Sequence, residues 1–509
     1  MFSVNNQEAI VKKGLTIDDV KKQVETFRKG NVYVELIGPA VINNGIKAFN
    51  EAEVSKYVNK YNNSIYDKEI VKFVPASGAA SRMFKDLFVA LEQMKNDDFN
   101  LSKEANQFLS FIKDFAFFQE LKVMLSDEGV DIEKNVTKKT YRLILDCLLT
   151  EIGMNYGNLP KALIKFHKYE EDARTPIEEH LVEGANYSKD EKRNVKIHFT
   201  VSSEFKEEII SFIESVLEYY EDLLDVRYSI DYSEQMPKTD TIAVNDKNEP
   251  FLIENDELLF RPSGHGALIY NLNDIEADIV FIKNIDNVVP DYLKAKTYIY
   301  KQALAGYLIE LQEKIYTYFN ALQDENIKDE TLDKIENFIQ NTLCVVLPND
   351  YKSRDKDSKV KVLLSKLDRP IRVCGMVKNE GEPGGGPFWV KNKDNSISLQ
   401  IIEKIQVNNN DKKQLEILNG STHFNPVDLV CSYVDSEGSL YDLLDYIDED
   451  SVMISDKTHN GKKIKILERP GLWNGAMADW NTIFVEVPIE TFNPVKTVND
   501  LLRKEHQPK

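Results

Sequence analysis

Short apolar runs separated by polar segments recur along this chain and predict the strands of a buried sheet. Residues 70–74 and 278–282 are largely apolar, whereas residues 195–201 alternate between apolar and polar positions. Runs of about four to eight such residues are typical of strands. The same patterns predict further strands at residues 32–37, 228–233, 371–377, 397–407, 427–433 and 482–487.

Helices are predicted between these strands, where apolar residues recur three and four positions apart. The pattern is densest over residues 86–155, which we interpret as a helical insertion. Residues 173–181, ARTPIEEHL, place Pro176 and acidic residues in the first turn of another helix. Further helices are expected at residues 204–224, with Ser202 or Ser203 as the cap, and at 290–323, 330–343 and 498–504, whereas the charge run 352–361 is typical of a solvated loop.

Strands that alternate with helices predict an α/β fold in which ligands bind at the carboxyl ends of the strands. A length of 509 residues exceeds one ordinary core and indicates two or three packed units. The net charge of -20 argues against nucleic acid as a main partner, because such binding needs a basic face. It is compatible with a small anionic ligand, which a few local cations and a metal can hold.

The four cysteines are widely spaced, and no two of them form a CxxC pair: Cys147, Cys344, Cys374 and Cys431. Reduced thiols therefore fit better than a disulfide framework or a zinc site. The first residues are too polar for a signal peptide, and no apolar stretch is long enough to span a bilayer. We therefore expect a cytoplasmic protein without a membrane partner.

The most informative motif is VPASGAASRM at residues 74–83, where an apolar run opens into small residues. Small residues let backbone N–H groups approach a phosphate chain closely, and Arg82 adds a planar fork of donors. A tight strand-to-helix turn selected for packing is the alternative. The expected nucleotide-binding positions of this loop are Pro75, Ala76, Ser77, Gly78, Ala79 and Ser81.

Two charged residues follow this loop along the chain. Lys161 lies in NLPKALIKF, where Pro160 holds the backbone while the lysine projects a mobile cation; a surface lysine is the alternative. Asp286 lies in DIVFIKNIDNVV, just after the apolar run 278–282, where an open sheet holds a metal. Its alternative role is to cap the helix that begins near Pro290.

The segment RPSGHGALIYNL flanks His265 with Gly264 and Gly266, so that its backbone can lie flat against a planar ring. A glycine-rich turn without a ligand is the alternative. Residues 471–481, GLWNGAMADWN, either line a ligand site or pack parts of the chain together, and packing is favoured.

The second half of the chain offers polar and aromatic side chains for a second ligand. The candidates are Trp389 at the end of the loop GEPGGGPFW (residues 381–389), Glu403, His423 and Asn425. An ordered turn, a strand-edge carboxylate and a hydrogen-bonding histidine are the respective structural alternatives for the first three. A second metal ligand beside Asp286 would be Asp428 or Asp479.

In this order the motifs resemble those of the sugar-nucleotide pyrophosphorylases, the nucleotidyltransferase branch of the GT-A fold. PASGAASRM is similar to the PAAGxGxRM loop of that family, PKAL to its Pro-Lys element, and RPSGHGALIYNL to its base-contacting PxGHG element. QIIEK at residues 400–404 is similar to the element whose glutamate meets the sugar. Ala80 departs from the family, because it stands where the family loop has its second glycine. At whole-chain level the sequence also resembles a bacterial domain-of-unknown-function family.

The resemblance implies a GT-A, Rossmann-like sheet flanked by helices and a magnesium-dependent reaction between a nucleoside triphosphate and a sugar 1-phosphate. Arg82 would hold the β- and γ-phosphates, Lys161 would bridge the α-phosphate and the acceptor phosphate, and Asp286 would ligate Mg²⁺. The GHG element would hold the base. A GT-A glycosyltransferase and a non-catalytic nucleotide-binding protein are the alternatives.

The expected domain organisation places the nucleotide site before the acceptor site along the chain. It comprises an N-terminal extension over residues 1–69, a nucleotide-binding α/β core over 70–345 with the helical insertion, an acceptor-binding half over 346–440 and a C-terminal α+β extension over 441–509.

Overall fold

The computed structural model describes residues 2–133, 138–381 and 384–509. The chain forms two compact units, each assembled from segments that are distant in sequence. Unit 1 contains residues 1–69, 235–281 and 302–487, and unit 2 contains residues 70–234, 282–301 and 488–509. This division does not follow the four consecutive segments expected from the sequence.

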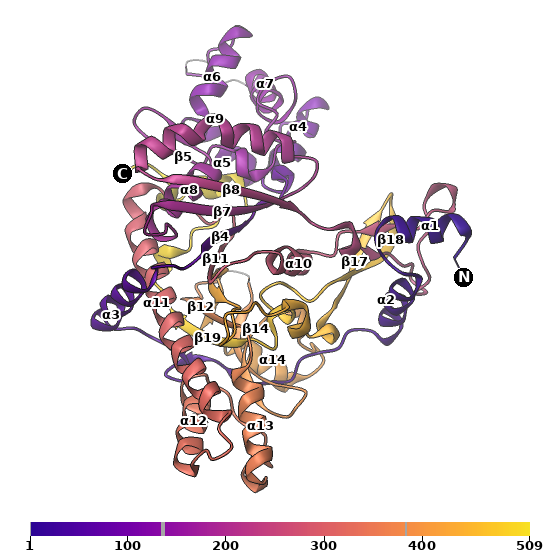
Figure 1. The fold of residues 1–509 in the computed structure, drawn as a ribbon. Helices are drawn as coiled ribbons and strands as arrows, with labels where there is room; N and C mark the ends of the chain where they lie inside the picture. The colour runs from indigo at the N-terminus through magenta and orange to yellow at the C-terminus, as the bar shows by residue number, and fades with distance from the viewer. Residues whose placement is uncertain (1, 134–137, 382–383) are drawn as a thin grey trace. The chain divides into compact units, whose positions relative to one another are not determined.

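Parallel strands form the centre of unit 2. β7 (Asn194–Val201) lies between β4 (Ile70–Pro75) and β8 (Arg227–Glu234). β4 is buried at every position except its last residue, as is typical of a parallel strand covered on both faces. Helices α8 (Pro176–Tyr187) and α9 (Lys206–Leu224) pack against these strands through a shared apolar cluster (Figure 1).

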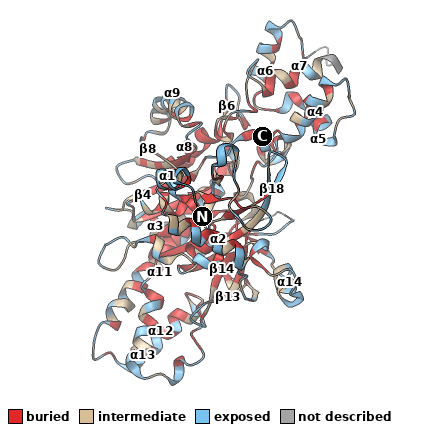
Figure 2. Cartoon of the chain, turned by 90° about the vertical axis from the view of Figure 1, so that its right-hand side faces the viewer, coloured by how far each residue is buried: buried red, intermediate tan, exposed pale blue. Residues whose placement is uncertain are grey.

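The helical insertion expected over residues 86–155 is confirmed. Helices α4 to α7 share one apolar core, and α6 and α7 carry both buried and exposed residues (Figure 2). The first turns of the long helix α11 also belong to unit 2. The bounds of these and the remaining elements are α4 (Lys85–Lys95), α5 (Lys103–Ser110), α6 (Phe118–Asp127), α7 (Lys138–Leu149), β5 (His167–Lys168), β6 (Ala173–Arg174) and α11 (Asp291–Leu322).

The main sheet of unit 1 is mixed. β12 (Ile371–Lys378) is parallel to β19 (Asn481–Glu486) and antiparallel to β16 (Asp428–Ser432). The sheet continues beyond β19 through short strands, and a further short strand pairs with the end of β12. These strands are β3 (Gly45–Lys47), β2 (Val41–Ile42) and β15 (His423–Phe424). β11 (Ile279–Lys283) carries the chain from unit 1 into unit 2.

A second, antiparallel sheet of unit 1 has the order β1-β13-β14, and β17 and β18 form a hairpin. Helices complete the unit. The bounds are α1 (Val4–Lys12), α2 (Ile17–Lys29), β1 (Leu36–Pro39), α3 (Glu51–Ser64), β9 (Thr241–Ile242), β10 (Phe260–Arg261), α10 (Leu268–Asn273), α12 (Asp329–Asn341), α13 (Lys356–Leu367), β13 (Gly386–Lys391), β14 (Ile397–Ile402), α14 (Lys412–Asn419), β17 (Met453–His459) and β18 (Lys462–Glu468).

Both units combine a sheet with helices, so the predicted α/β class is confirmed. Two local predictions were wrong. The charge run at residues 352–361 is not a solvated loop throughout, because α13 begins within it, and α9 begins after Phe205 without a side-chain cap from Ser202 or Ser203. Among the residues that the structure describes, no helix is long and apolar enough to cross a membrane.

Candidate functional site

The small-residue loop of unit 2 leaves the end of β4 and turns into a short 3₁₀ helix. Ser77, Gly78 and Ala79 at its tip are exposed. The loop is held by the segment that carries Lys161, because the Lys161 N–H donates to the Gly78 carbonyl at 3.0 Å. An exposed loop of small residues, fixed from one side, suits the approach of a phosphate chain to the backbone.

Ala80 occupies its position for packing. Its side chain is fully buried in an apolar cluster that includes Met83, Phe84 and Leu87. Its N–H donates to the Leu159 carbonyl at 3.0 Å. The methyl group that replaces the glycine of the resembled family therefore adds buried surface, and the N–H of this residue serves the fold.

Lys161 and Asp286 meet, although 125 residues separate them along the chain. The Lys161 Nζ lies 2.8 Å from the Asp286 Oδ2, and both side chains are partly exposed, at 16% and 21%. Lys161 stands at the start of a 3₁₀ helix that begins after Pro160, and Asp286 follows the end of β11. Two of the three predicted catalytic residues are thus brought together beside the loop.

A third segment, which the sequence did not predict, contacts Lys161 and Asp286; it comprises residues 493–498, and we call it the C-terminal strap. The Val495 carbonyl accepts a hydrogen bond from the Lys161 Nζ at 2.9 Å, and the Val495 N–H donates to the Asp286 carbonyl at 3.1 Å. The Val498 N–H donates to the Met83 carbonyl at 3.1 Å. The strap therefore touches the loop, the lysine and the aspartate, and no periodicity or motif in its sequence indicates this.

Arg82 is exposed at the end of the same loop. Within residues 2–133, 138–381 and 384–509, its side chain has no hydrogen-bond or ion-pair partner. Its guanidinium is therefore available to an anion that approaches the loop.

The GHG element of unit 1 is shaped by a neighbouring loop. A Cβ on Gly266 would lie 2.1 Å from the Pro470 carbonyl oxygen, so only glycine fits there. Gly264 has a φ of 79°, which also favours glycine. The two glycines are thus explained by backbone packing and conformation, which is the structural alternative for this motif.

His265 belongs to a cluster with Glu403 and Trp473. Its ring stacks on that of Trp473, with centroids 4.1 Å apart and an interplanar angle of 14°. The Leu472 N–H donates to the His265 Nδ1 at 3.0 Å, so the proton of the neutral ring is on Nε2, which lies 3.8 Å from the Glu403 Oε1. Burial lowers the pKa of His265 to about 4, so the ring is neutral at pH 7.

Glu403 is the carboxylate of this cluster. Burial and the nearby Glu468 raise its pKa above the ordinary value, while a hydrogen bond with Trp473 acts in the opposite direction. The structure thus brings two predicted residues, His265 and Glu403, together with Trp473 from the segment 471–481 that had been interpreted as packing.

Trp389 does not lie in a loop, contrary to expectation. It belongs to β13, opposite Gly38 of β1 and Leu399 of β14. Part of the preceding glycine-rich loop, residues 382–383, lies outside the described residues. The aromatic ring beside His265 and Glu403 is instead that of Trp473. Trp473 lies two residues after Gly471, in a segment whose sequence does not predict a strand.

His423, Asn425 and Asp428 are buried in unit 1. Asn425 donates to the Gly375 carbonyl at 3.2 Å and accepts from the Val427 N–H at 3.0 Å, which holds Val427 at a φ of 58°. The His423 Nε2 lies 3.3 Å from the Glu486 Oε1. These residues shape the turn into β16, and their expected contact with a ligand stays a prediction.

The residues suit a metal only in part. Within the described residues, no group of three His, Cys, Asp or Glu side chains could hold a metal ion. Mg²⁺ commonly takes one or two carboxylates together with substrate phosphates, so the partly exposed Asp286 fits an ion that arrives with a triphosphate. Asp428 is 3% exposed at the start of β16 and is poorly placed for an open site.

Three solved structures are similar to this chain over nearly its whole length. A UDP-N-acetylglucosamine pyrophosphorylase from Trypanosoma brucei is 11% identical, with a TM-score of 0.48, over 96% of this chain and 74% of that one. A UDP-glucose phosphorylase from the same organism is 14% identical, with a TM-score of 0.46, over 99% and 80%. A UDP-glucose pyrophosphorylase from Leishmania major is 14% identical, with a TM-score of 0.42, over 99% and 79%.

A search of curated proteins finds no match. One family model matches residues 3–507, nearly the whole chain. The chain therefore belongs to the family described as "Domain of unknown function (DUF4301)".

Proposed function

We propose that this protein transfers a nucleotidyl group from a nucleoside triphosphate to a sugar 1-phosphate and releases pyrophosphate. The observation that carries the proposal is the pair Lys161–Asp286, 2.8 Å apart and partly exposed beside a loop of small residues. A mobile cation and a carboxylate at a phosphate-type loop are what such a transfer needs, because it requires positioning and charge neutralisation and no protein nucleophile.

In this reaction an oxygen of the acceptor phosphate attacks the α-phosphorus in line. The bond from that phosphorus to the pyrophosphate oxygen breaks, and the electron pair leaves with pyrophosphate. Arg82 binds the β- and γ-phosphates through its exposed guanidinium. Lys161 exchanges Asp286 for the α-phosphate and the acceptor phosphate, and the Val495 carbonyl keeps its ammonium at the loop.

The same exchange releases Asp286 for Mg²⁺, which when bound supplies positive charge to the phosphates. Within unit 1, the neutral His265 directs its Nε2–H toward Glu403, and a carboxylate held in this way suits hydrogen bonds from the hydroxyl groups of a sugar. The exposed part of the Trp473 ring offers an apolar face beside them.

The two alternatives have less support from the residues. A GT-A glycosyltransferase needs an acidic metal motif, and the acidic run at Asp448 and Asp450 is already paired with Lys393, at 2.7 and 2.6 Å. A non-catalytic binding protein was favoured by the missing loop glycine, but Ala80 is accounted for by burial in the core.

The test measures pyrophosphate release with Mg²⁺ while the common nucleoside triphosphates are crossed with a panel of sugar 1-phosphates. We expect release that depends on one triphosphate and one acceptor, and a fall of about 10²-fold or more in Asp286→Asn and Lys161→Met. Lys168→Met is the matched control, because Lys168 is an exposed lysine of the neighbouring β5. Equal release by wild type and Asp286→Asn would refute the proposal.

A further inference from the structure

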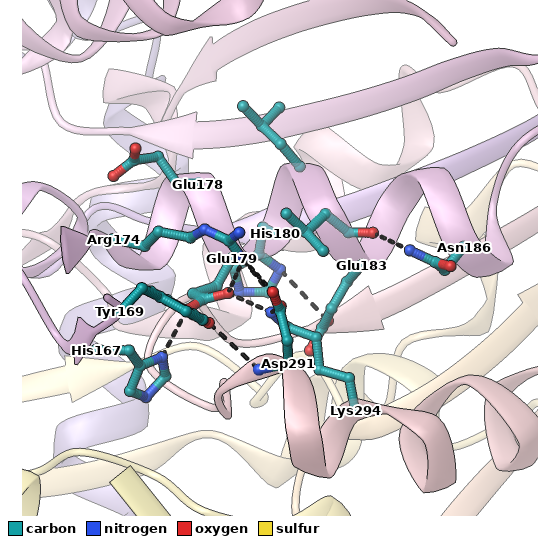
Figure 3. Close-up of polar contacts among 12 residues, drawn as sticks. His167, Tyr169, Arg174, Glu178, Glu179, His180, Glu183, Asn186, Asp291 and Lys294 are labelled. Carbon is teal, nitrogen blue, oxygen red and sulfur yellow. Dashed lines mark hydrogen bonds and ion pairs between the residues drawn. The ribbon is translucent and has the colours of Figure 1, made fainter. Parts of the chain in front are cut away.

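Helix α8 of unit 2 buries an unusual amount of charge. Pro176 occupies its first turn, as the sequence predicts, and the structure adds Thr175 as its cap. Three polar side chains on the helix, Glu179, His180 and Glu183, are fully buried. Figure 3 shows Glu179 directed toward Lys294, while Glu178 points away from this group. Buried charges of this kind need partners, and their partners indicate what they do.

Glu183 joins the two strands that lead into the candidate site. Its Oε2 lies 3.2 Å from the Lys72 Nζ of β4, and its Oε1 lies 2.7 Å from the Lys283 Nζ of β11. Lys72 is three residues before Pro75, where the loop begins, and Lys283 is three residues before Asp286. One buried carboxylate therefore fixes the distance between the ends of β4 and β11, which lead into the loop and to Asp286.

His180 holds the peptides directly before Asp286. Its Nε2 lies 3.2 Å from the carbonyl oxygens of both Asn284 and Ile285. Since both partners are acceptors, the ring proton is on Nε2. Burial and the positive charge of Lys72 and Lys283 lower the pKa of His180 well below its ordinary value, so the ring is neutral.

The other half of the network contacts different elements. Glu179 accepts hydrogen bonds from the His167 Nδ1 at 2.7 Å and the Tyr169 hydroxyl at 2.8 Å, and it also pairs with Lys294 (Figure 3). These partners belong to β5, the following turn and α11. The connection to Asp286 thus runs through His180 and Glu183 rather than through Glu179.

Burying several charges does not by itself make this region more stable, because apolar residues of similar volume often serve as well. The buried charges instead make the contacts specific, because each hydrogen bond holds one group in one position. From these contacts we infer that His180 and Glu183 are positioning residues that hold Asp286 at its working distance from the loop and from Lys161. The inference rests on the proposed function for the role of Asp286.

The test compares His180→Leu with His180→Gln, since the glutamine amide can still donate to the two carbonyls. Glu178→Gln is the matched control, because Glu178 is a buried carboxylate on the same helix that contacts Thr175 and Tyr220 instead. Each variant is examined for kcat and KM of pyrophosphate release, for the Mg²⁺ concentration that gives half-maximal rate, and for amide hydrogen exchange at residues 284–289.

We expect His180→Leu to lower kcat by about 10- to 100-fold, because small misplacements of reacting groups have effects of this size. The half-maximal Mg²⁺ concentration should rise, KM for the acceptor should change little, and exchange at residues 284–289 should accelerate. His180→Gln should recover most of these losses. A purely structural role would lower the stability of the variant without raising the Mg²⁺ requirement.

Two results would overturn the inference and can be separated from failure of the proposed function. If wild type releases pyrophosphate and His180→Leu does so with unchanged kcat and Mg²⁺ dependence, His180 does not position Asp286. If wild type releases none on the panel, the proposed function fails, and the exchange measurement decides alone: unchanged exchange at residues 284–289 in His180→Leu removes the geometric basis of the inference.

Discussion

Replacing Glu183 by glutamine tests the buried network most directly. The change keeps the size and shape of the side chain and removes its charge. Lys72 and Lys283 then lose their shared carboxylate, while their side chains stay buried, at 0% and 2% exposed. Breaking a buried ion pair by removing one partner costs about 3–5 kcal/mol, and we expect a loss of stability of that order.

The loss should depend on pH. Burial lowers the pKa of Lys72 to about 7 in spite of the opposing effect of Glu183, and without this carboxylate the pKa falls further. A lysine whose folded pKa lies below its unfolded pKa binds fewer protons when folded, so its unfavourable contribution grows as pH falls. The deficit of Glu183→Gln relative to wild type should therefore increase from pH 8 to pH 5.5, by up to about 1.4 kcal/mol per pH unit for each proton difference.

The assay is urea unfolding at several pH values, with Glu178→Gln as the control on the same helix. The second variant Lys72→Met/Glu183→Gln removes one unpaired ammonium group and should regain part of the lost stability. If Glu183→Gln unfolds at the urea concentration of wild type at both pH 8 and pH 5.5, Glu183 does not compensate buried lysines and the reasoning fails.

Three further outcomes are expected. Lys161→Met and Asp286→Asn should be strongly non-additive in pyrophosphate release, because the two residues form one pair; a double variant as slow as the product of both losses would contradict this. Gly266→Ala should lower the free energy of unfolding by about 1–3 kcal/mol in urea unfolding, since its Cβ would meet the Pro470 carbonyl at 2.1 Å. Wild-type stability of this variant would show that the segment around Pro470 moves away from residue 266 at no cost. Thr175→Ala should lose about 1 kcal/mol by thermal unfolding through loss of the helix cap, and no loss would mean that the cap is dispensable.

The sequence predicted those parts of the fold that local patterns encode. The apolar run before the loop became β4, and ARTPIEEHL became the start of α8, because a capping threonine and a proline at the first turn act locally. The charge run at residues 352–361 did not predict the start of α13, which depends on Asp355 as its cap and on the buried Leu363 and Leu367, one turn apart on the helix.

The candidate site was predictable only where its residues carry a motif. Lys161 and Asp286 were recognised from their neighbours in sequence, and the structure places them 2.8 Å apart. The C-terminal strap was not recognised, because the bond from Lys161 to the Val495 carbonyl joins residues 334 positions apart and uses a backbone atom. The stacking of Trp473 on His265 was likewise not predicted, since it depends on two loops whose meeting no local pattern encodes.

The position of the C-terminal strap has a consequence for how the protein is made. Unit 2 is built from residues 70–234, 282–301 and 488–509, and the whole middle of unit 1 is synthesised before the last of these segments. On the ribosome, the loop and Lys161 emerge long before the carbonyl of Val495 that binds this lysine. The proposed site can therefore form completely only after translation has passed the strap, so an interrupted chain carries the loop, the lysine and the aspartate without the contact to Val495.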